Sequence, residues 1–234
     1  MSAKKISPCM LNFSPAEIGG LKKCLARFAP AETKTKYEAL RAKTGGTTIT
    51  LYTSGKLVIQ GPDCGKVKDA LLAEFGAKSE LVLGIDETGR GEATGPLVIC
   101  GVLGETSKLR ELRDSKKTKN MAGKYALATK NSLANFTISI GAEMVSLLRE
   151  RGINLNQMQE KSIDAIACLF SELSPDAKVR VDGSALKVCT KGIEFIPKGD
   201  DKEPVIGAAS VIAKHVRNIS GDATKRRNWG AHKG

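Results

Sequence analysis

The chain has 234 residues, which is enough for one large domain or for a small domain followed by a medium-sized one. Its 37 Lys and Arg outnumber its 25 Asp and Glu, and the net charge of +12 favours a polyanionic partner such as nucleic acid over a merely basic surface. No apolar run approaches the ~20 residues of a membrane span, and the first residues lack the apolar core of a signal peptide, so we expect no membrane association.

Cysteine usage points to a reducing compartment. The six cysteines form no Cys-x-x-Cys pair, so neither a zinc site nor a disulfide framework is indicated. Free thiols are typical of interior compartments, and we therefore expect a cytoplasmic protein. Because aromatic residues make up only 4% of the chain, the core is expected to be aliphatic.

The first part of the chain predicts a small α+β domain. A helix is expected over residues 14–28, where Ser14 and Pro15 give start signals and Leu21, Leu25 and Phe28 share one face. A short helix is expected over 35–42, a hairpin over 47–61 with Ser54-Gly55 at its turn, and a helix over 66–75. We place the end of this domain near residue 77, giving domains 1–77 and 80–234.

The hairpin of this first domain is a candidate nucleic-acid surface. It would expose Tyr52, Lys56 and alternating threonines on one face, in a region that is basic and has no cluster of acids. An ordinary solvated sheet explains the same composition, and the sequence leaves the two readings open.

The second part of the chain is organised around residues 81–103. An apolar run over 81–85 predicts a buried strand, and it ends in two adjacent acids, Asp86 and Glu87. A glycine-flanked arginine follows, and then a second apolar run over 97–103. A carboxylate at the end of a buried strand is costly unless a positive group meets it, which is a first indication of a metal ion.

The remaining elements alternate between helices and strands. Residues 108–120 form a dense basic loop, which is either a solvated face or a phosphate contact through Ser115, Lys116 and Lys117. The patterns that follow predict a helix over 122–133, a strand over 136–139, a strand or short helix over 143–151, a helix over 157–173, strands over 178–183 and 192–197, an acidic loop over 199–204 and a small-residue helix over 205–216.

Four acids in this part form a candidate metal site. Asp86 and Asp182 each end an apolar strand, Glu87 follows Asp86, and Asp200 precedes a helix. If the two strands are neighbours, their acids meet at one edge of the sheet and repel one another without a cation. Hard oxygen ligands suit Mg²⁺ or Mn²⁺, and two such ions about 4 Å apart could activate water for phosphodiester cleavage. Alternatively, Asp182 and Asp200 are ordinary turn acids.

The segment Gly89-Arg90-Gly91 is a weaker signal. Its glycines allow a backbone to approach a ligand closely, and Arg90 could grip a phosphate, although a purely structural turn looks the same. It matches neither a P-loop nor a dinucleotide-binding fingerprint.

Taken together, these motifs resemble the signature of type 2 ribonucleases H, the ribonuclease HII and HIII group. The resemblance covers about residues 80 to 218, with the motifs in the family's order: Asp86-Glu87-Thr88-Gly89-Arg90-Gly91, Gly95-Pro96-Leu97-Val98, Asp114-Ser115-Lys116-Lys117, Val181-Asp182-Gly183, Lys198-Gly199-Asp200 and Ala208-Ala209-Ser210-Val211-Ile212-Ala213-Lys214. It implies a ribonuclease H-like fold, a mixed α/β sheet flanked by helices, and cleavage of the RNA strand of RNA–DNA hybrids to 5′-phosphate and 3′-hydroxyl ends.

The resemblance also implies roles for individual residues. The four metal-site acids fall on Asp86, Glu87, Asp182 and Asp200, and the backbone of Gly89, Arg90 and Gly91 is implied to read the ribose 2′-hydroxyl, the group that distinguishes RNA from DNA. Residues 51–61 resemble the N-terminal domain of ribonuclease HIII, a TATA-binding-protein-like domain that serves hybrid binding. No position matches the tyrosine that ribonuclease HII uses at a DNA–RNA junction, which bears on single embedded ribonucleotides.

Several alternatives follow from the same residues. A non-catalytic nucleic-acid-binding protein of this fold would keep the basic surface, and a DNA nuclease or resolvase would cut DNA without ribose. His215 is expected to be structural, while Lys214 and Arg217 are candidates for phosphate contacts. We expect the protein to act as a monomer.

Overall fold

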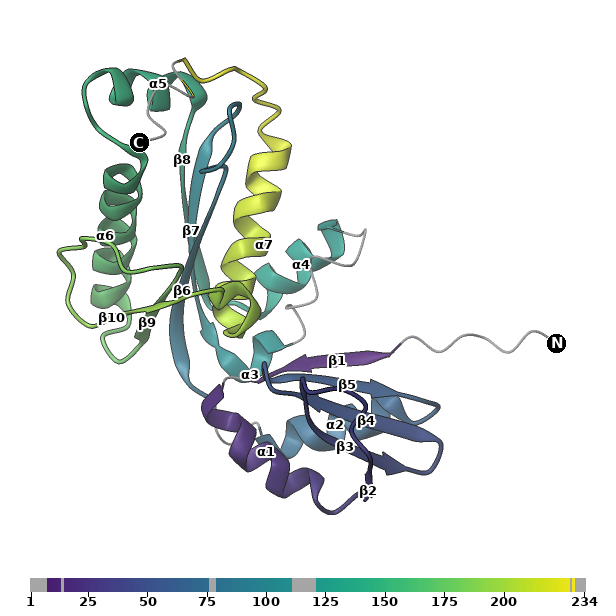
Figure 1. Ribbon diagram of the computed structural model, residues 1–234. Coiled ribbons are helices and arrows are strands. Elements are labelled where there is room, and N and C mark those ends of the chain that lie inside the picture. Colours follow the sequence, from purple (N-terminus) through teal and green to yellow (C-terminus); the bar gives the residue numbers. More distant parts are fainter. Residues whose placement is uncertain (1–7, 14, 76–78, 111–120, 228, 230–234) are drawn as a thin grey trace.

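The computed structural model describes residues 8–13, 15–75, 79–110, 121–227 and 229. It has two lobes, and each lobe is built on a five-stranded sheet (Figure 1). The expected domain boundary near residue 77 falls within 76–78, and Lys116 and Lys117 fall within 111–120; both segments lie outside the described residues.

The first lobe is an antiparallel sheet covered on one face by two helices (Figure 1). Its core joins Leu21, Leu25 and Leu71 of the helices to Ile49 and Leu51 of the sheet, all fully buried. The hairpin and both flanking helices are confirmed. In chain order the elements are β1 (Cys9–Asn12), η1 (Pro15–Glu17), α1 (Ile18–Leu25), β2 (Ala29–Ala31), β3 (Glu38–Thr44), β4 (Thr47–Tyr52), β5 (Lys56–Gln60) and α2 (Cys64–Phe75), with strand order β1-β5-β4-β3-β2.

Two expectations for this lobe are wrong. The helix expected over 35–42 is instead the start of β3, where Arg41 lies opposite Thr50 of β4 and Ala42 is buried. Pairing with a distant strand overrides a local composition that favours helix. The expected row of exposed threonines is also absent from the described hairpin, because Thr50 is only 3% exposed on its central strand.

The second lobe is a mixed sheet with strand order β10-β9-β6-β7-β8. Strand β6 pairs antiparallel with β7 and parallel with β9, so β6 and β9 end at the same edge. The elements are β6 (Leu81–Thr88), β7 (Leu97–Glu105), α3 (Thr106–Leu109), α4 (Met121–Asn131), β8 (Ala134–Ile140), α5 (Ala142–Glu150), α6 (Leu155–Leu173), β9 (Lys178–Asp182), β10 (Ile193–Ile196), η4 (Gly199–Asp201) and α7 (Pro204–Ile219).

Helices cover both faces of this sheet (Figure 1). Alternate residues of β6 and β7 face α4 and α7 on one side, through Val82 and Val98, and face α5 and α6 on the other, through Leu83 and Ile99. Residues 143–151, expected as strand or helix, are helical. None of the helices described here has the length and apolar character needed to cross a bilayer.

Helix α7 packs directly on β6 because Gly84 has no side chain. A Cβ at Gly84 would lie 2.5 Å from the backbone nitrogen of Ile206 and 2.5 Å from the backbone carbon of Val205. The glycine therefore sets how closely α7 approaches the strand that carries the two adjacent acids.

The two lobes meet at a buried polar junction. Arg110, just after α3, is fully buried, and its guanidinium pairs with Glu17 and lies 4.5 Å from the ring centre of Phe13. Its backbone carbonyl accepts a 3.0 Å hydrogen bond from Nδ2 of Asn12. Since all three partners belong to the first lobe, the junction fixes one lobe against the other.

Candidate active site

The four predicted acids lie around one rim of the second sheet. Ile85 of β6 pairs with Val181 of the parallel strand β9, so the next residues, Asp86 of β6 and Asp182 at the end of β9, lie toward the same edge of the sheet. Glu87 follows Asp86 on β6, and Asp200 lies on η4. The backbone N–H of Asp200 donates to Oδ1 of Asp182 at 3.4 Å, which brings η4 to the end of β9.

Burial and mutual repulsion raise the pKa values of the two acids on β6. Burial raises the pKa of Asp86 to about 8, and the charges of Asp182 and Glu87 add to the shift. Burial likewise raises the pKa of Glu87, with Asp182 and Asp200 contributing in the same direction. Carboxylates held in this way need a cation to carry their charge at neutral pH, and such perturbed groups cluster at functional sites.

Two helices support the buried acids with side chains that the sequence did not single out. Ser210 of α7 hydrogen-bonds Asp86, and Lys214 donates to the hydroxyl of Ser210 at 2.5 Å. Gln159 of α6 is 3% exposed and donates from Nε2 to Glu87 at 2.9 Å. The small residues of α7 predicted close packing, but nothing local marked Ser210 or Gln159 as partners of the acids.

The donor set fits a divalent metal ion in its chemistry. All four groups are hard oxygen donors; Asp86 is buried, the other three are partly buried, and the charges of Asp182 and Asp200 add to the pKa shifts of the two acids on β6. Among the described residues, no three His, Cys, Asp or Glu side chains converge on a single point as they stand.

The loop from Gly89 to Pro96 follows the acids directly. Arg90 and Gly91 are exposed, and their backbone N–H groups have no acceptor among the described residues. The Arg90 side chain bonds Oδ1 of Asn156 on α6. His215 stacks on Tyr125, with 3.9 Å between ring centres, in agreement with its expected structural role.

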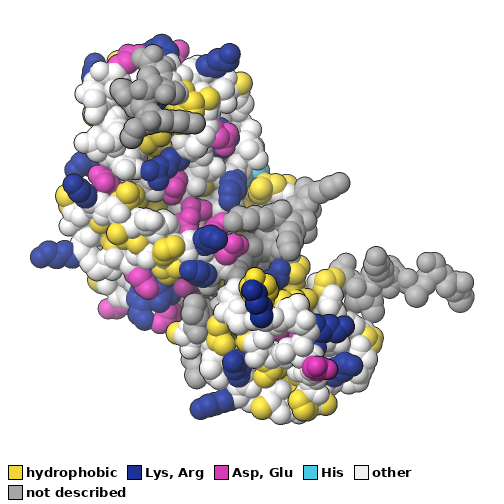
Figure 2. Space-filling model, in the orientation of Figure 1, with side chains coloured by type: hydrophobic (Ala, Val, Ile, Leu, Met, Phe, Trp, Pro, Cys, Tyr) yellow, Lys and Arg dark blue, Asp and Glu magenta, His cyan; other side chains and the backbone are white. Residues whose placement is uncertain are grey.

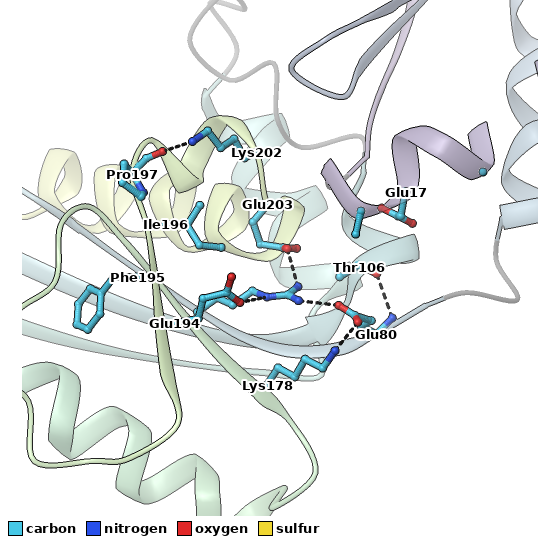
Figure 3. Close-up of a pocket in the computed structure, with 13 residues that line it drawn as sticks. Glu17, Glu80, Thr106, Lys178, Glu194, Phe195, Ile196, Pro197, Lys202 and Glu203 are labelled. Atoms are coloured by element: carbon cyan, nitrogen blue, oxygen red, sulfur yellow. Dashed lines mark hydrogen bonds and ion pairs between the residues drawn. The ribbon is translucent and has the colours of Figure 1, made fainter. Parts of the chain in front are cut away.

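A separate cavity of about 620 Å³ between the lobes includes none of the four acids (Figure 3). Arg180 crosses it, donating to Glu203 at 2.7 Å, to Glu80 at 2.8 Å and to Glu194 at 3.1 Å. Burial raises the pKa of Glu203 to about 7, against the opposing effect of Arg180. The network joins β9 and β10 to the N-terminus of α7, which gives it a structural role in the second lobe.

Comparisons with known proteins agree with this geometry. A family model described as "Ribonuclease HII" matches residues 83–234, and one described as "Domain of unknown function (DUF3378)" matches residues 10–78. Ribonuclease HII of Methanothermobacter thermautotrophicus is 32% identical over 164 residues, which cover 63% of this chain and 78% of that protein.

Two solved structures resemble both lobes. Aquifex aeolicus RNase H3 has a TM-score of 0.52 at 22% identity, covering 90% of this chain and 84% of that one. Bst-RNase HIII, solved in complex with Mn²⁺, has a TM-score of 0.56 at 16% identity, covering 91% of this chain and 81% of that one. At these identities the structures establish the fold.

The mixed sheet, the helices on both faces and the additional small lobe define a protein of the ribonuclease H-like class. The family match extends over more than half of the chain. The chain belongs to the ribonuclease HII family, and it is an endoribonuclease of the type 2 ribonuclease H group that acts on RNA–DNA hybrids, with the two-lobed arrangement of ribonuclease HIII.

Proposed function

We propose that Asp86, Glu87, Asp182 and Asp200 are the catalytic centre, where the RNA strand of a hybrid is hydrolysed to 5′-phosphate and 3′-hydroxyl ends. The observation that carries the proposal is the parallel pairing of β6 with β9, which brings Asp86 of β6 and Asp182, the last residue of β9, toward one rim of the sheet. The four carboxylates would hold Mg²⁺ or Mn²⁺, and Mn²⁺ is present in the similar Bst-RNase HIII. When bound, such ions supply Lewis-acid activation of water and stabilise the leaving oxygen.

The residues of the chain orient the substrate and the acids in this proposal. Ser210 and Gln159 hold the carboxylates of Asp86 and Glu87 in place by hydrogen bonds. The free N–H groups of Arg90 and Gly91 lie next to the acids along the chain, where a ribose hydroxyl can accept from them. Lys116 and Lys117 are retained in the proposal as phosphate contacts.

The first lobe, residues 1–77, is proposed to bind the hybrid for the catalytic lobe, residues 80–234. Its two helices cover one face of the sheet and leave the other face open (Figure 1). Lys and Arg side chains lie on both lobes of the face drawn in Figure 2, as a surface that binds a polyanion requires. The proposal includes a monomer in the cytoplasm, where the six free cysteines stay reduced.

Replacement of the most buried acid tests the proposal. Asp86→Asn keeps the shape of the side chain but removes its charge, so hydrolysis of a hybrid with Mg²⁺ or Mn²⁺ should fall by at least about 100-fold. Binding of the hybrid should change little, because the open sheet face is untouched. Turnover and binding are measured on the same labelled hybrid, with chelator as the control for metal dependence.

Substrate comparison separates the proposal from its rivals. Wild-type protein is assayed on a full hybrid, on DNA with one embedded ribonucleotide, and on an all-DNA duplex of the same sequence. Binding without cleavage of any of them would indicate a non-catalytic protein, and cutting of the all-DNA duplex would indicate a DNA nuclease. Undiminished turnover by Asp86→Asn would contradict the assignment of the acids.

A further inference from the structure

The loop from Gly89 to Pro96 is held by a segment more than 120 residues further along the chain. The N–H of Gly95 donates to the carbonyl of Thr224, and the N–H of Arg226 donates to the carbonyl of Ala93, each at 2.9 Å. Thr94 and Lys225 form an antiparallel bridge between these contacts. Residues 222–226, here called the strap, therefore run along the second half of the loop.

One arginine of the strap joins both ends of the loop. Arg226 is 3% exposed, and its Nε donates to the carbonyl of Gly95 at 2.8 Å. Its Nη1 donates to the carbonyl of Gly89 at 2.8 Å and to that of Glu92 at 3.0 Å. A planar guanidinium fixes the directions of these bonds, so a single side chain sets the separation of three carbonyls.

A second arginine holds the loop from helix α7. Arg217 donates from Nη2 to the carbonyl of Thr94 at 2.9 Å and from Nε to that of Pro96 at 3.3 Å, and it pairs with Glu92 at 2.6 Å. The sequence made Arg217 a candidate for contacts with substrate phosphates, and in the structure its described hydrogen bonds go to the loop.

The conformation of the loop depends on the space that Arg217 fills. Gly89 has a φ of +84°, and a Cβ there would lie 2.8 Å from Nε of Arg217 and 2.3 Å from the carbonyl oxygen of Pro96. The glycine, the strap and α7 are thus fitted to one another.

Burial of the Arg226 guanidinium disfavours its charged form. Burial lowers the pKa of Arg226, and the neighbouring Arg217 lowers it further. Its bonds go to neutral carbonyls, and among the described residues Nη2 has no hydrogen-bond partner; the guanidinium carbon lies 5.0 Å from the ring centre of Trp229. Glu92 and Asp222 oppose this shift, and all three hydrogen bonds of the guanidinium go to carbonyls of the loop, so its planar fork fixes the position of that loop.

These contacts produce a loop in which several carbonyls accept hydrogen bonds from the two arginines, while two N–H groups stay available to a ligand. The carbonyl of Gly89 faces the strap, while the N–H groups of Arg90 and Gly91 have no acceptor among the described residues. We infer that Arg226, assisted by Arg217, is a positioning residue that holds the Gly89–Gly91 backbone in the shape that receives a substrate ribose hydroxyl. This inference rests on the proposed function, which assigns ribose recognition to that backbone.

Replacement of Arg226 in the full chain tests the inference. Arg226→Met keeps much of the volume but removes three hydrogen bonds to the loop, and Arg226→Lys keeps the charge without the planar fork. Arg227→Met is the matched control, because Arg227 is exposed and its side chain, within the described part of the chain, donates to Glu150 and not to the loop; its backbone N–H, which the substitution keeps, donates to the hydroxyl of Ser146. Affinities for an RNA–DNA hybrid and for a DNA duplex of the same sequence are measured in the Asp86→Asn background, and hydrogen exchange is measured over residues 88–96.

The preference for hybrid over DNA should fall roughly tenfold in Arg226→Met, because the hydrogen bonds that hold the loop in shape are lost. Affinity for the DNA duplex should stay unchanged, because DNA has no 2′-hydroxyl. Hydrogen exchange should become faster in the loop but not in β6 or β7. Arg226→Lys should be intermediate and Arg227→Met unchanged.

An unchanged preference together with unchanged loop exchange, in a folded Arg226→Met protein, would overturn the inference. If that variant does not fold, Arg226→Lys decides in the same way. Failure of the proposed function is seen separately, because wild-type protein would then not cleave the hybrid with Mg²⁺ or Mn²⁺ at all.

Discussion

Asp86 is buried so deeply that its negatively charged form is disfavoured unless a cation binds beside it. With 4% of its surface exposed, it accepts hydrogen bonds from Ser210 and from the N–H of Glu87, and its charged neighbours are Asp182, Glu87 and Lys214. Burial outweighs these favourable contacts and raises the pKa of Asp86, because a desolvated carboxylate opposes folding. At the scale of single residues, burial of Asp86 therefore costs stability, and in our proposal the residue is kept for its role in catalysis.

Glu38 shows the opposite behaviour, because its partners favour its charged form. Hydrogen bonds from Arg41, and next from the backbone of Lys34, lower its pKa from 4.5 to about 2. A lowered pKa contributes stability above the unfolded value, and that contribution is lost as pH falls from 4.5 toward 2.

We therefore expect Glu38→Gln to lower the free energy of unfolding at pH 7, with a difference from wild type that shrinks as the pH falls below 4.5. Urea denaturation from pH 7 down to the lowest pH at which both proteins fold measures this difference. Arg41→Met breaks the same pair and should show the same pH dependence. A difference that stays constant with pH would contradict the role given to this pair.

At the scale of elements, contact between α7 and β6 decides the geometry of the rim. Helix α7 brings Ser210 and Lys214 to Asp86 because its N-terminal turn sits against Gly84. The contact is backbone against backbone, so it cannot relax by rotation of a side chain.

Gly84→Ala should accordingly destabilise the protein by about 1–3 kcal/mol, the usual range for overpacking. It should also reduce turnover, because α7 is pushed away from Asp86. Gly19→Ala is the matched control: a Cβ at Gly19 in α1 meets nothing within 4 Å, and alanine favours helix. Denaturation midpoints and turnover compare the two, and equal effects would show that β6 and α7 are not tightly packed.

Sequence reasoning succeeded where the pattern was local. Helix α6 and strands β6 and β9 follow their hydrophobic periodicity, and the acids at the ends of those strands were found from it. It failed where distant pairing decides, as in β3, whose residues suggested helix but pair with β4.

The same limit explains what was missed in the site. Arg226 lies in a polar, basic tail, and nothing near it in sequence indicates carbonyls more than 130 residues away. Ser210 and Gln159 resemble ordinary helix residues, and only the folded sheet brings them to the acids.

At the scale of the whole molecule, the two lobes divide binding from hydrolysis in our proposal. Lys43 of β3 is exposed and follows the buried Ala42, so it points to the open face of the first sheet. Lys23 lies exposed on α1, one of the two helices that cover the other face.

Lys43→Glu should raise the KM for a hybrid roughly tenfold at low salt and leave kcat unchanged, since a phosphate contact becomes a repulsion. The salt dependence of binding should weaken by the equivalent of about one ion. Lys23→Glu makes the same change of net charge on the far side and should have little effect. Equal effects of the two variants would indicate that net charge alone matters.

The buried junction at Arg110 has a consequence for the shortest substrate the enzyme can use. Because Arg110 pairs with Glu17 and stacks on Phe13 out of contact with solvent, the offset between the two binding surfaces is fixed. A fixed offset sets a minimum substrate length, because a duplex too short to span it can occupy only one surface at a time. In our proposal, catalytic efficiency should therefore climb steeply with duplex length and level off once both surfaces are bridged.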